Sequence, residues 1–125
     1  MTLPADLATG ADLAEQLLRD VGNEQMRAAT RLLGAHREGY WLRRFTASSG
    51  MLDTEGATPS IDWTAVGLGL IDGDLQGSFS ELAVLRFAVS LVGRAPVDLK
   101  TVLGSVDAGQ ARLLVRALRE AANLA

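Results

Sequence analysis

The chain of 125 residues contains no cysteine and only one histidine, His36. Without cysteine it cannot form a disulfide scaffold, a thiolate zinc site, an iron–sulfur cluster or a cysteine nucleophile. One histidine cannot supply a multi-histidine metal site or a two-histidine reaction. These absences remove most of the enzyme classes that a sequence can reveal.

The chain also lacks a surplus of basic residues and a long apolar run. Its 12 basic and 15 acidic side chains give a net charge of −3, the wrong sign for a generic nucleic-acid binder. No stretch approaches the roughly 18 apolar residues of a membrane-spanning helix. Residues 1–6 lack the basic start of a secretory signal. We therefore expect a cytoplasmic protein with no membrane contact, and nucleic acid is a disfavoured partner.

Leucine and alanine supply 40 of the 125 residues, whereas only six residues are aromatic. Because both are strong helix formers, the sequence predicts an all-α fold. We expect a compact single-domain bundle of five or six helices over residues 1–125, long enough to bury a core. Eleven of the twelve basic residues are arginine, a usage typical of high-GC genomes.

Capping residues and 3.6-residue periodicity define the expected helices. Thr9, Ser78 and Asp107 stand at expected helix starts, each with an acidic or amide side chain three residues later. Residues 40–45 fit both a strand and a helix, and we favour a helical continuation or an irregular packed turn. Residues 46–59 form the longest expected loop. The expected helices span residues 11–21, 24–38, 62–71, 79–92, 98–104 and 107–123.

The helix expected over residues 79–92 is apolar nearly all round, with few polar side chains such as Glu81 and Arg86. A helix with so little solvent-facing surface belongs in the middle of a bundle. We therefore expect Leu85, Phe87 and Val89 to be deeply buried.

A distinctive pattern of residues marks the second half of the chain. It runs Ser78-x-Ser80-Glu81-x-x-x-Leu85-Arg86-x-Ala88-x-Ser90-Leu91, then Pro96-Val97-Asp98-Leu99, then Asp107 and Leu114-Val115-x-Ala117-Leu118-x-x-Ala121. Over residues 61–122 this resembles small uncharacterised all-helical proteins of high-GC actinobacteria and their phages. The resemblance implies a helical fold and a high-GC origin, and it brings no activity or binding residue with it.

Residues 72–80 partly match a calcium-binding loop. The last position of such a loop needs a bidentate glutamate, and here it is Ala83. The spacing of Ser78 and Glu81 instead indicates a turn between helices that ends in a capping box. We therefore expect no metal site. The matched positions are Asp72, Asp74, Gln76, Gly77, Phe79 and Ser80.

Two further patterns suggest chemistry but favour packing. Gly67-x-Gly69-x-x-x-Gly73 is similar to a phosphate-binding glycine loop, yet the segment before it is expected to be helical and not a strand. Close helix packing explains these glycines better. His36 has no recognisable nucleophile motif to act with, so we expect a partly buried packing histidine. No catalytic residue, cofactor or small-molecule substrate is expected.

The C-terminal segment 98–123 has a helix-turn-helix-like outline, which provides an alternative function as a DNA-associated regulator. Its DNA contacts would be Gln110, Arg112 and Arg116. However, Asp107 at the start of the second helix would face the phosphates, which weakens this hypothesis.

Surplus apolar positions on the last helix favour a protein partner instead. Leu113, Ala117 and Leu124 form a second apolar stripe, beside an arginine stripe of Arg112, Arg116 and Arg119. Exposed contiguous apolar surface usually marks a partner site, and the commonest partner is a second copy. We therefore expect a non-enzymatic protein–protein interaction module, a homodimer or a partner of another protein. The inner face is expected to contain Ala111, Leu114, Val115, Leu118, Ala121 and Ala122.

Overall fold

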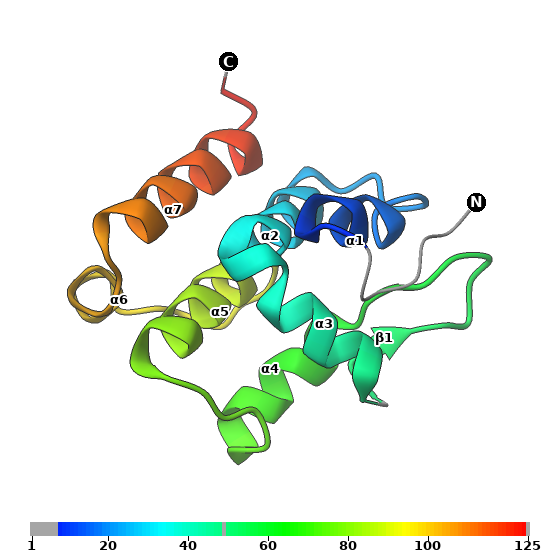
Figure 1. The fold of residues 1–125 in the computed structure, drawn as a ribbon, viewed down its shortest axis with the longest axis horizontal. Helices are drawn as coiled ribbons and strands as arrows, with labels where there is room; N and C mark the ends of the chain where they lie inside the picture. The colour runs from blue at the N-terminus through cyan, green and yellow to red at the C-terminus, as the bar shows by residue number, and fades with distance from the viewer. Residues whose placement is uncertain (1–7, 49, 125) are drawn as a thin grey trace.

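A computed structural model describes residues 8–48 and 50–124 (Figure 1). This part of the chain forms seven α-helices, one 3₁₀ turn and two very short strands, so the predicted all-α fold is confirmed with one helix more than expected. The additional helix is formed by the segment that the sequence left ambiguous. The elements are α1 Gly10–Gln16, α2 Glu24–Ala35, η1 His36–Glu38, α3 Tyr40–Ala47, β1 Leu52–Asp53, β2 Ser60–Ile61, α4 Trp63–Asp72, α5 Phe79–Val92, α6 Leu99–Ser105 and α7 Ala108–Ala121.

The predicted capping boxes at Thr9, Ser78 and Asp107 are confirmed. At each start the cap side chain accepts a hydrogen bond from the third helical N–H, and the side chain at that third position accepts one from the cap N–H. Each box satisfies two backbone donors that a helix start would otherwise leave without a partner. This local chemistry explains why the starts of α1, α5 and α7 could be predicted to within a residue.

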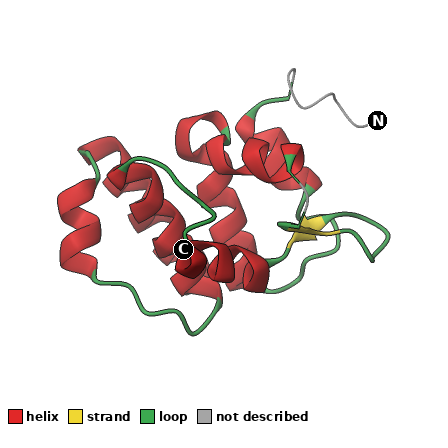
Figure 2. Cartoon of the chain, turned by 90° about the horizontal axis from the view of Figure 1, so that it is seen from below, coloured by secondary structure: helices red, strands yellow, loops and turns green. Residues whose placement is uncertain are grey.

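The core lies between α2 and α5, with α7 and α1 packed on the outside of α2. Leu85, Phe87 and Val89 are buried, as the apolar character of α5 predicts. The two strands lie at one edge of the helical body (Figure 2). They pair antiparallel, with Leu52 opposite Ile61, and close the loop that the sequence predicted over 46–59.

The helix expected over 24–38 is shorter, because α2 ends at Ala35. Three successive residues then have positive φ, namely Arg37 at 48°, Glu38 at 54° and Gly39 at 78°. This left-handed turn redirects the chain into α3. Residues 40–45, which fit both a strand and a helix by sequence, therefore form a separate helix instead of continuing α2. The helix expected over 11–21 also ends early, at Gln16.

The glycines of α4 agree only in part with the interpretation of close helix packing, because Gly69 is tight against Leu75 of the following turn and Gly67 makes only an ordinary contact with α5. A Cβ built at Gly69 would lie 3.1 Å from the side chain of Leu75. A Cβ at Gly67 would lie 3.8 Å from a methyl group of Val89 on α5. The preceding segment is helical, so the strand that a phosphate-binding glycine loop requires is not there.

Candidate protein-interaction surface

Helix α7 buries a different stripe from the one expected. Leu114, Ala117 and Ala121 face inward, and Ala117 is only 4% exposed. Leu113 is half-buried against the core. The expectation that Leu113 and Ala117 would be available to a partner is therefore wrong, because α2 covers them within the same chain.

The apolar residues that remain exposed on α7 were mostly expected inside. Val115 is 56% exposed and Leu118 is 47% exposed, whereas both were assigned to the inner face. Leu124, just beyond the helix, is 64% exposed and agrees with its assignment to the outer stripe. The helix carries two overlapping apolar stripes, and the position of α2 decides which one is buried.

The three arginines of the predicted stripe are exposed beside these apolar residues. Within the described residues, Arg112 and Arg116 have no acidic partner. Together with Val115 and Leu124 the arginines edge an open hollow on the outside of α7, and Leu118 is exposed three residues after Val115. We call this set the α7 surface, which consists of Arg112, Val115, Arg116, Leu118, Arg119 and Leu124.

The α7 surface stands on a helix that is firmly attached to the rest of the fold. Arg31 of α2 bridges Glu15 of α1 and Glu120 of α7, with N–O distances of 3.0 Å to each. The hydrogen bond that Arg31 donates to Glu15 is the main cause that raises the pKa of Arg31. Gln25 also donates a 2.9 Å hydrogen bond to the carbonyl oxygen of Ala121. These contacts fix the orientation in which α7 presents its outer face.

Gln110, an expected DNA contact, instead points into the fold. Its amide oxygen accepts a hydrogen bond from the N–H of Asp107, so its Nε2 faces Nε2 of His36 at 3.4 Å. An amide nitrogen can only donate, which makes His36 Nε2 the acceptor and puts the ring proton on Nδ1. The assignment of Gln110 to DNA is therefore corrected, because its hydrogen-bonding groups are used inside the chain.

His36 is fully buried, more deeply than the partly buried packing histidine that was expected. Its Nδ1 has no hydrogen-bond partner within the described residues. Burial is the main cause that lowers the pKa of His36, and the charge of Arg37 lowers it further. The ring is therefore neutral near pH 7. Among the described residues the only hydrogen-bond partner of its ring is the amide of Gln110, which is not a nucleophile.

The aromatic side chains of residues 40–45 also pack inside the fold. Trp41 and Phe45 are fully buried, and the indole Nε1 of Trp41 donates a 2.9 Å hydrogen bond to the carbonyl oxygen of Glu81. The guanidinium of Arg44 lies 4.7 Å from the Trp41 ring centre. The buried rings cannot stack on nucleic-acid bases, so this segment is an internal anchor between α3 and α5.

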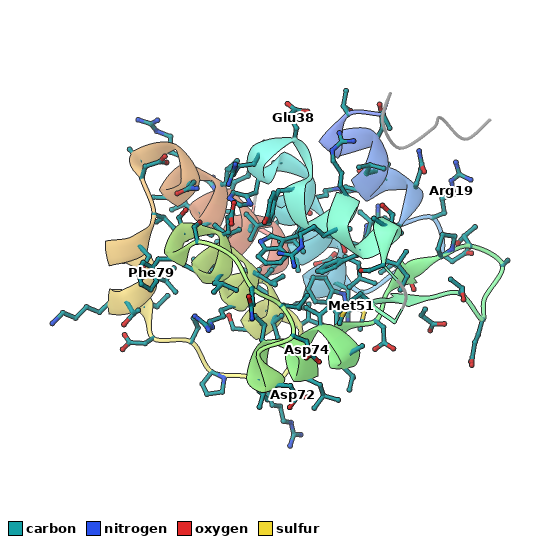
Figure 3. The ribbon with its side chains drawn as sticks, turned by 60° about the horizontal axis from the view of Figure 1, so that its bottom comes forward. Arg19, Glu38, Met51, Asp72, Asp74 and Phe79 are labelled. Carbon is teal, nitrogen blue, oxygen red and sulfur yellow. The ribbon has the colours of Figure 1, made fainter. Side chains whose placement is uncertain are left out.

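The partial calcium loop has no carboxylate at its last position, and the nearby Glu81 is engaged elsewhere. Ala83 is buried in α5, and the carboxylate of Glu81 accepts hydrogen bonds from Ser78 and pairs with Arg37. The Ser78 N–H is the main cause that lowers the pKa of Glu81. Asp72 and Asp74 lie exposed at the end of α4 (Figure 3). Across residues 8–48 and 50–124 there is no group of three side chains suited to hold a metal ion.

The sequence interpretation missed an exposed face on α4. Leu68 is 54% exposed and Ile71 is 79% exposed, and both lie on the same side as Asp72 because residues three and four apart share a helix face. Ile71 also edges a groove that is lined mostly by apolar residues, including Gly67 and Val89, and by the exposed Arg86 of α5. The signal was present in the sequence, since Leu68 and Ile71 stand opposite the buried Val66 and Gly69, but the glycines obscured the periodicity.

No described helix combines the length and the apolar character needed to cross a membrane. Comparison of the chain with models of protein families, with curated proteins and with solved structures gave no significant match.

Proposed function

We propose that this protein is a non-enzymatic protein–protein interaction module that associates with further copies of itself through the α7 surface. The observation that supports the proposal is an open hollow edged by three arginines, Val115 of α7 and Leu124 just beyond the helix. Leu118, three residues after Val115, is exposed beside it. An interface commonly has an apolar centre and a polar rim in which arginine is enriched. The proposed location is the cytoplasm, on the sequence grounds given above.

The size of the apolar patch indicates weak association. Burying a whole Val or Leu side chain contributes about 1.5–3 kcal/mol. About half of each of the three side chains remains to be buried, so the three together contribute roughly 2–4 kcal/mol. Association costs at least about 4 kcal/mol in lost freedom of movement. The arginines must therefore pair with acids on the partner to make the association favourable.

A DNA-associated regulator is the second candidate function. Figure 1 favours it in one respect, because α6 is seen end-on while α7 runs across the view, so the two helices are steeply inclined as in a helix-turn-helix. The internal position of Gln110 and the exposed Asp107 at the start of α7 weaken it. A duplex of random sequence in low salt, tested by gel shift, separates the two functions, since phosphate binding weakens steeply with salt.

Sedimentation velocity tests the proposed self-association. We expect the weight-average mass to rise above 13.2 kDa as the concentration increases from about 10 µM to about 1 mM, the range of weak association. The double variant Val115→Glu/Leu118→Glu should remain a monomer. The matched control is Phe79→Glu, which changes an equally apolar and almost fully exposed residue in the first turn of α5. A natural chain of 13.2 kDa at every concentration would overturn the proposal.

A further inference from the structure

The α7 surface and the outward face of α4 are complementary in charge and similar in apolar character. We propose that α7 of one copy docks on the outward face of α4 of a second copy, so that chains join head to tail. This inference rests on the self-association proposed above and names the surface that the α7 surface binds.

Docking of α7 on α7 is unfavourable because of the arginines. A two-fold interface brings the same patch of both chains together. It would gather Arg112 and Arg116 from each chain, and the nearby acid Glu120 is already paired with Arg31. Like charges that face each other across an interface cost several kcal/mol. The partner of the α7 surface must therefore present acids.

The outward face of α4 presents acids beside apolar residues. Leu68 and Ile71 are exposed by more than half, Asp72 is exposed at the last position of the helix, and Asp74 is exposed two residues beyond it. Neither aspartate makes a hydrogen bond or ion pair within the described residues. We call these four residues the α4 face. Both carboxylates can accept a guanidinium without breaking any existing contact.

Charge along the sequence is divided in the same way. Residues 45–85 contain six acidic side chains and no basic one, whereas residues 86–125 contain six basic and three acidic side chains. The first segment contains α4 and the second contains α7. The complementarity of the two faces is therefore part of a wider field that attracts the C-terminal region of one copy to the middle region of another.

The two faces cannot meet within one chain. In Figure 1, α7 lies at the upper left and α4 at the bottom, with α5 and α2 between them. Figure 3 shows Asp72 at the lower edge of the molecule and Asp74 beside the ribbon of α4. When the α7 surface of one copy binds the α4 face of another, the pair still has one free α7 surface and one free α4 face. Assembly therefore continues beyond two copies, into open chains or closed rings.

Charge reversal of each face tests this arrangement by sedimentation velocity. One variant is Arg112→Glu/Arg116→Glu and the other is Asp72→Lys/Asp74→Lys, and circular dichroism checks that both remain helical. We expect each variant alone to be monomeric, since its two faces now carry charges of the same sign. A 1:1 mixture should assemble again, because each face then finds the opposite charge on the other variant. The natural chain should exceed twice 13.2 kDa.

The control is Asp53→Lys/Glu55→Lys, which reverses two exposed acids of the same acidic segment away from α4. It should assemble as the natural chain does. If the α4 variant alone assembles as well as the natural chain, self-association holds but the head-to-tail arrangement is overturned. If the natural chain stays a monomer, both proposals are overturned. An assembly that is unchanged between low salt and about 1 M salt also contradicts the charge pairing, because that salt concentration screens exposed charges beyond about 3 Å.

Discussion

The backbone of Gly10 in α1 lies directly against the backbone of Gly34 in α2. A Cβ built at Gly10 would fall 1.9 Å from the carbonyl oxygen of Gly34, and a Cβ built at Gly34 would fall 2.7 Å from the carbonyl oxygen of Gly10. A Cβ built at Gly39, at the end of the left-handed turn, would fall 3.1 Å from the Cα of Gly10. Three glycines therefore allow α1, α2 and the start of α3 to meet at backbone contact.

Gly10→Ala should destabilise the protein strongly. The added methyl group would overlap with a backbone oxygen, which cannot move as the end of a flexible side chain can, so α1 must shift off α2. We expect a loss of more than about 2 kcal/mol in the free energy of unfolding, at the upper end of the usual cost of overpacking. Urea denaturation followed by circular dichroism measures it.

The matched control for this glycine is Gly104→Ala. Gly104 lies within α6, and a Cβ there meets nothing within 4 Å. Alanine should therefore stabilise the helix by about 0.5–1 kcal/mol. Equal stability of the Gly10→Ala variant and the natural chain would contradict the tight crossing of α1 and α2.

Leu85→Ala should cost about 2–5 kcal/mol, because it removes a fully buried side chain and leaves a cavity at the centre of the fold. Leu85→Asp should prevent folding, since it adds a buried charge with no partner. Phe79→Ala on the same helix should change stability by less than about 0.5 kcal/mol, because Phe79 is almost fully exposed. Thermal and urea unfolding measure all three. A soluble, equally stable Leu85→Asp variant would show that α5 is not central.

Mild acid should destabilise the fold through His36. Its pKa is lowered in the folded chain, chiefly by burial, so the unfolded chain takes up a proton first as the pH falls. The stability from the neutral ring is complete above pH 6.5, the unfolded pKa, and is lost as the pH falls through the folded pKa. One group contributes a slope of at most about 1.4 kcal/mol per pH unit. Urea midpoints between pH 7.5 and pH 5 measure the slope.

A His36→Phe variant isolates this effect, because phenylalanine fills the site without titrating. Its stability should be lower at pH 7.5, where Gln110 loses the acceptor nitrogen, and should depend less on pH between 6.5 and 5. Glu81 acts in a separate window, because its pKa is lowered from 4.5, so its contribution is lost only at lower pH. The same slope in both proteins would show that another group is responsible.

The sequence was sufficient for the local features of the fold. Capping boxes at Ser78 and Asp107 and the apolar character of α5 each depend on residues a few positions apart, so they can be predicted without the tertiary structure. The end of α2 could not be predicted in the same way. Arg37 and Glu38 adopt left-handed conformations that their types do not favour, and tertiary contacts must hold them there.

The candidate surface was predicted on the correct helix but partly with the wrong residues. Periodicity identifies both apolar stripes of α7, whereas only the position of α2 shows that Ala117 is inside and Val115 is outside. The capping box with Asp107 uses the amide oxygen of Gln110 locally, whereas the contact of its Nε2 with His36 joins residues 74 positions apart in the sequence. Contacts of this range decide which face is free, and a single sequence does not contain that information in local form.

Glu38→Gly should stabilise the protein, although glycine usually destabilises a fold. Glu38 has a φ of 54°, and a left-handed conformation costs a non-glycine residue about 1–2 kcal/mol. Its carboxylate makes only a long contact of 3.5 Å with the N–H of Gly10, and its side chain is exposed (Figure 3), so little is lost with it. Glycine also adds freedom to the unfolded chain, which costs about 0.5–1 kcal/mol. The net gain should be up to about 1 kcal/mol in the free energy of unfolding, measured by urea denaturation. The control is Arg112→Gly in α7. The backbone there is helical, so glycine should cost about 1 kcal/mol. A loss of 1 kcal/mol or more in Glu38→Gly, equal to that of the control, would show that the turn at residues 37–39 is not left-handed in solution.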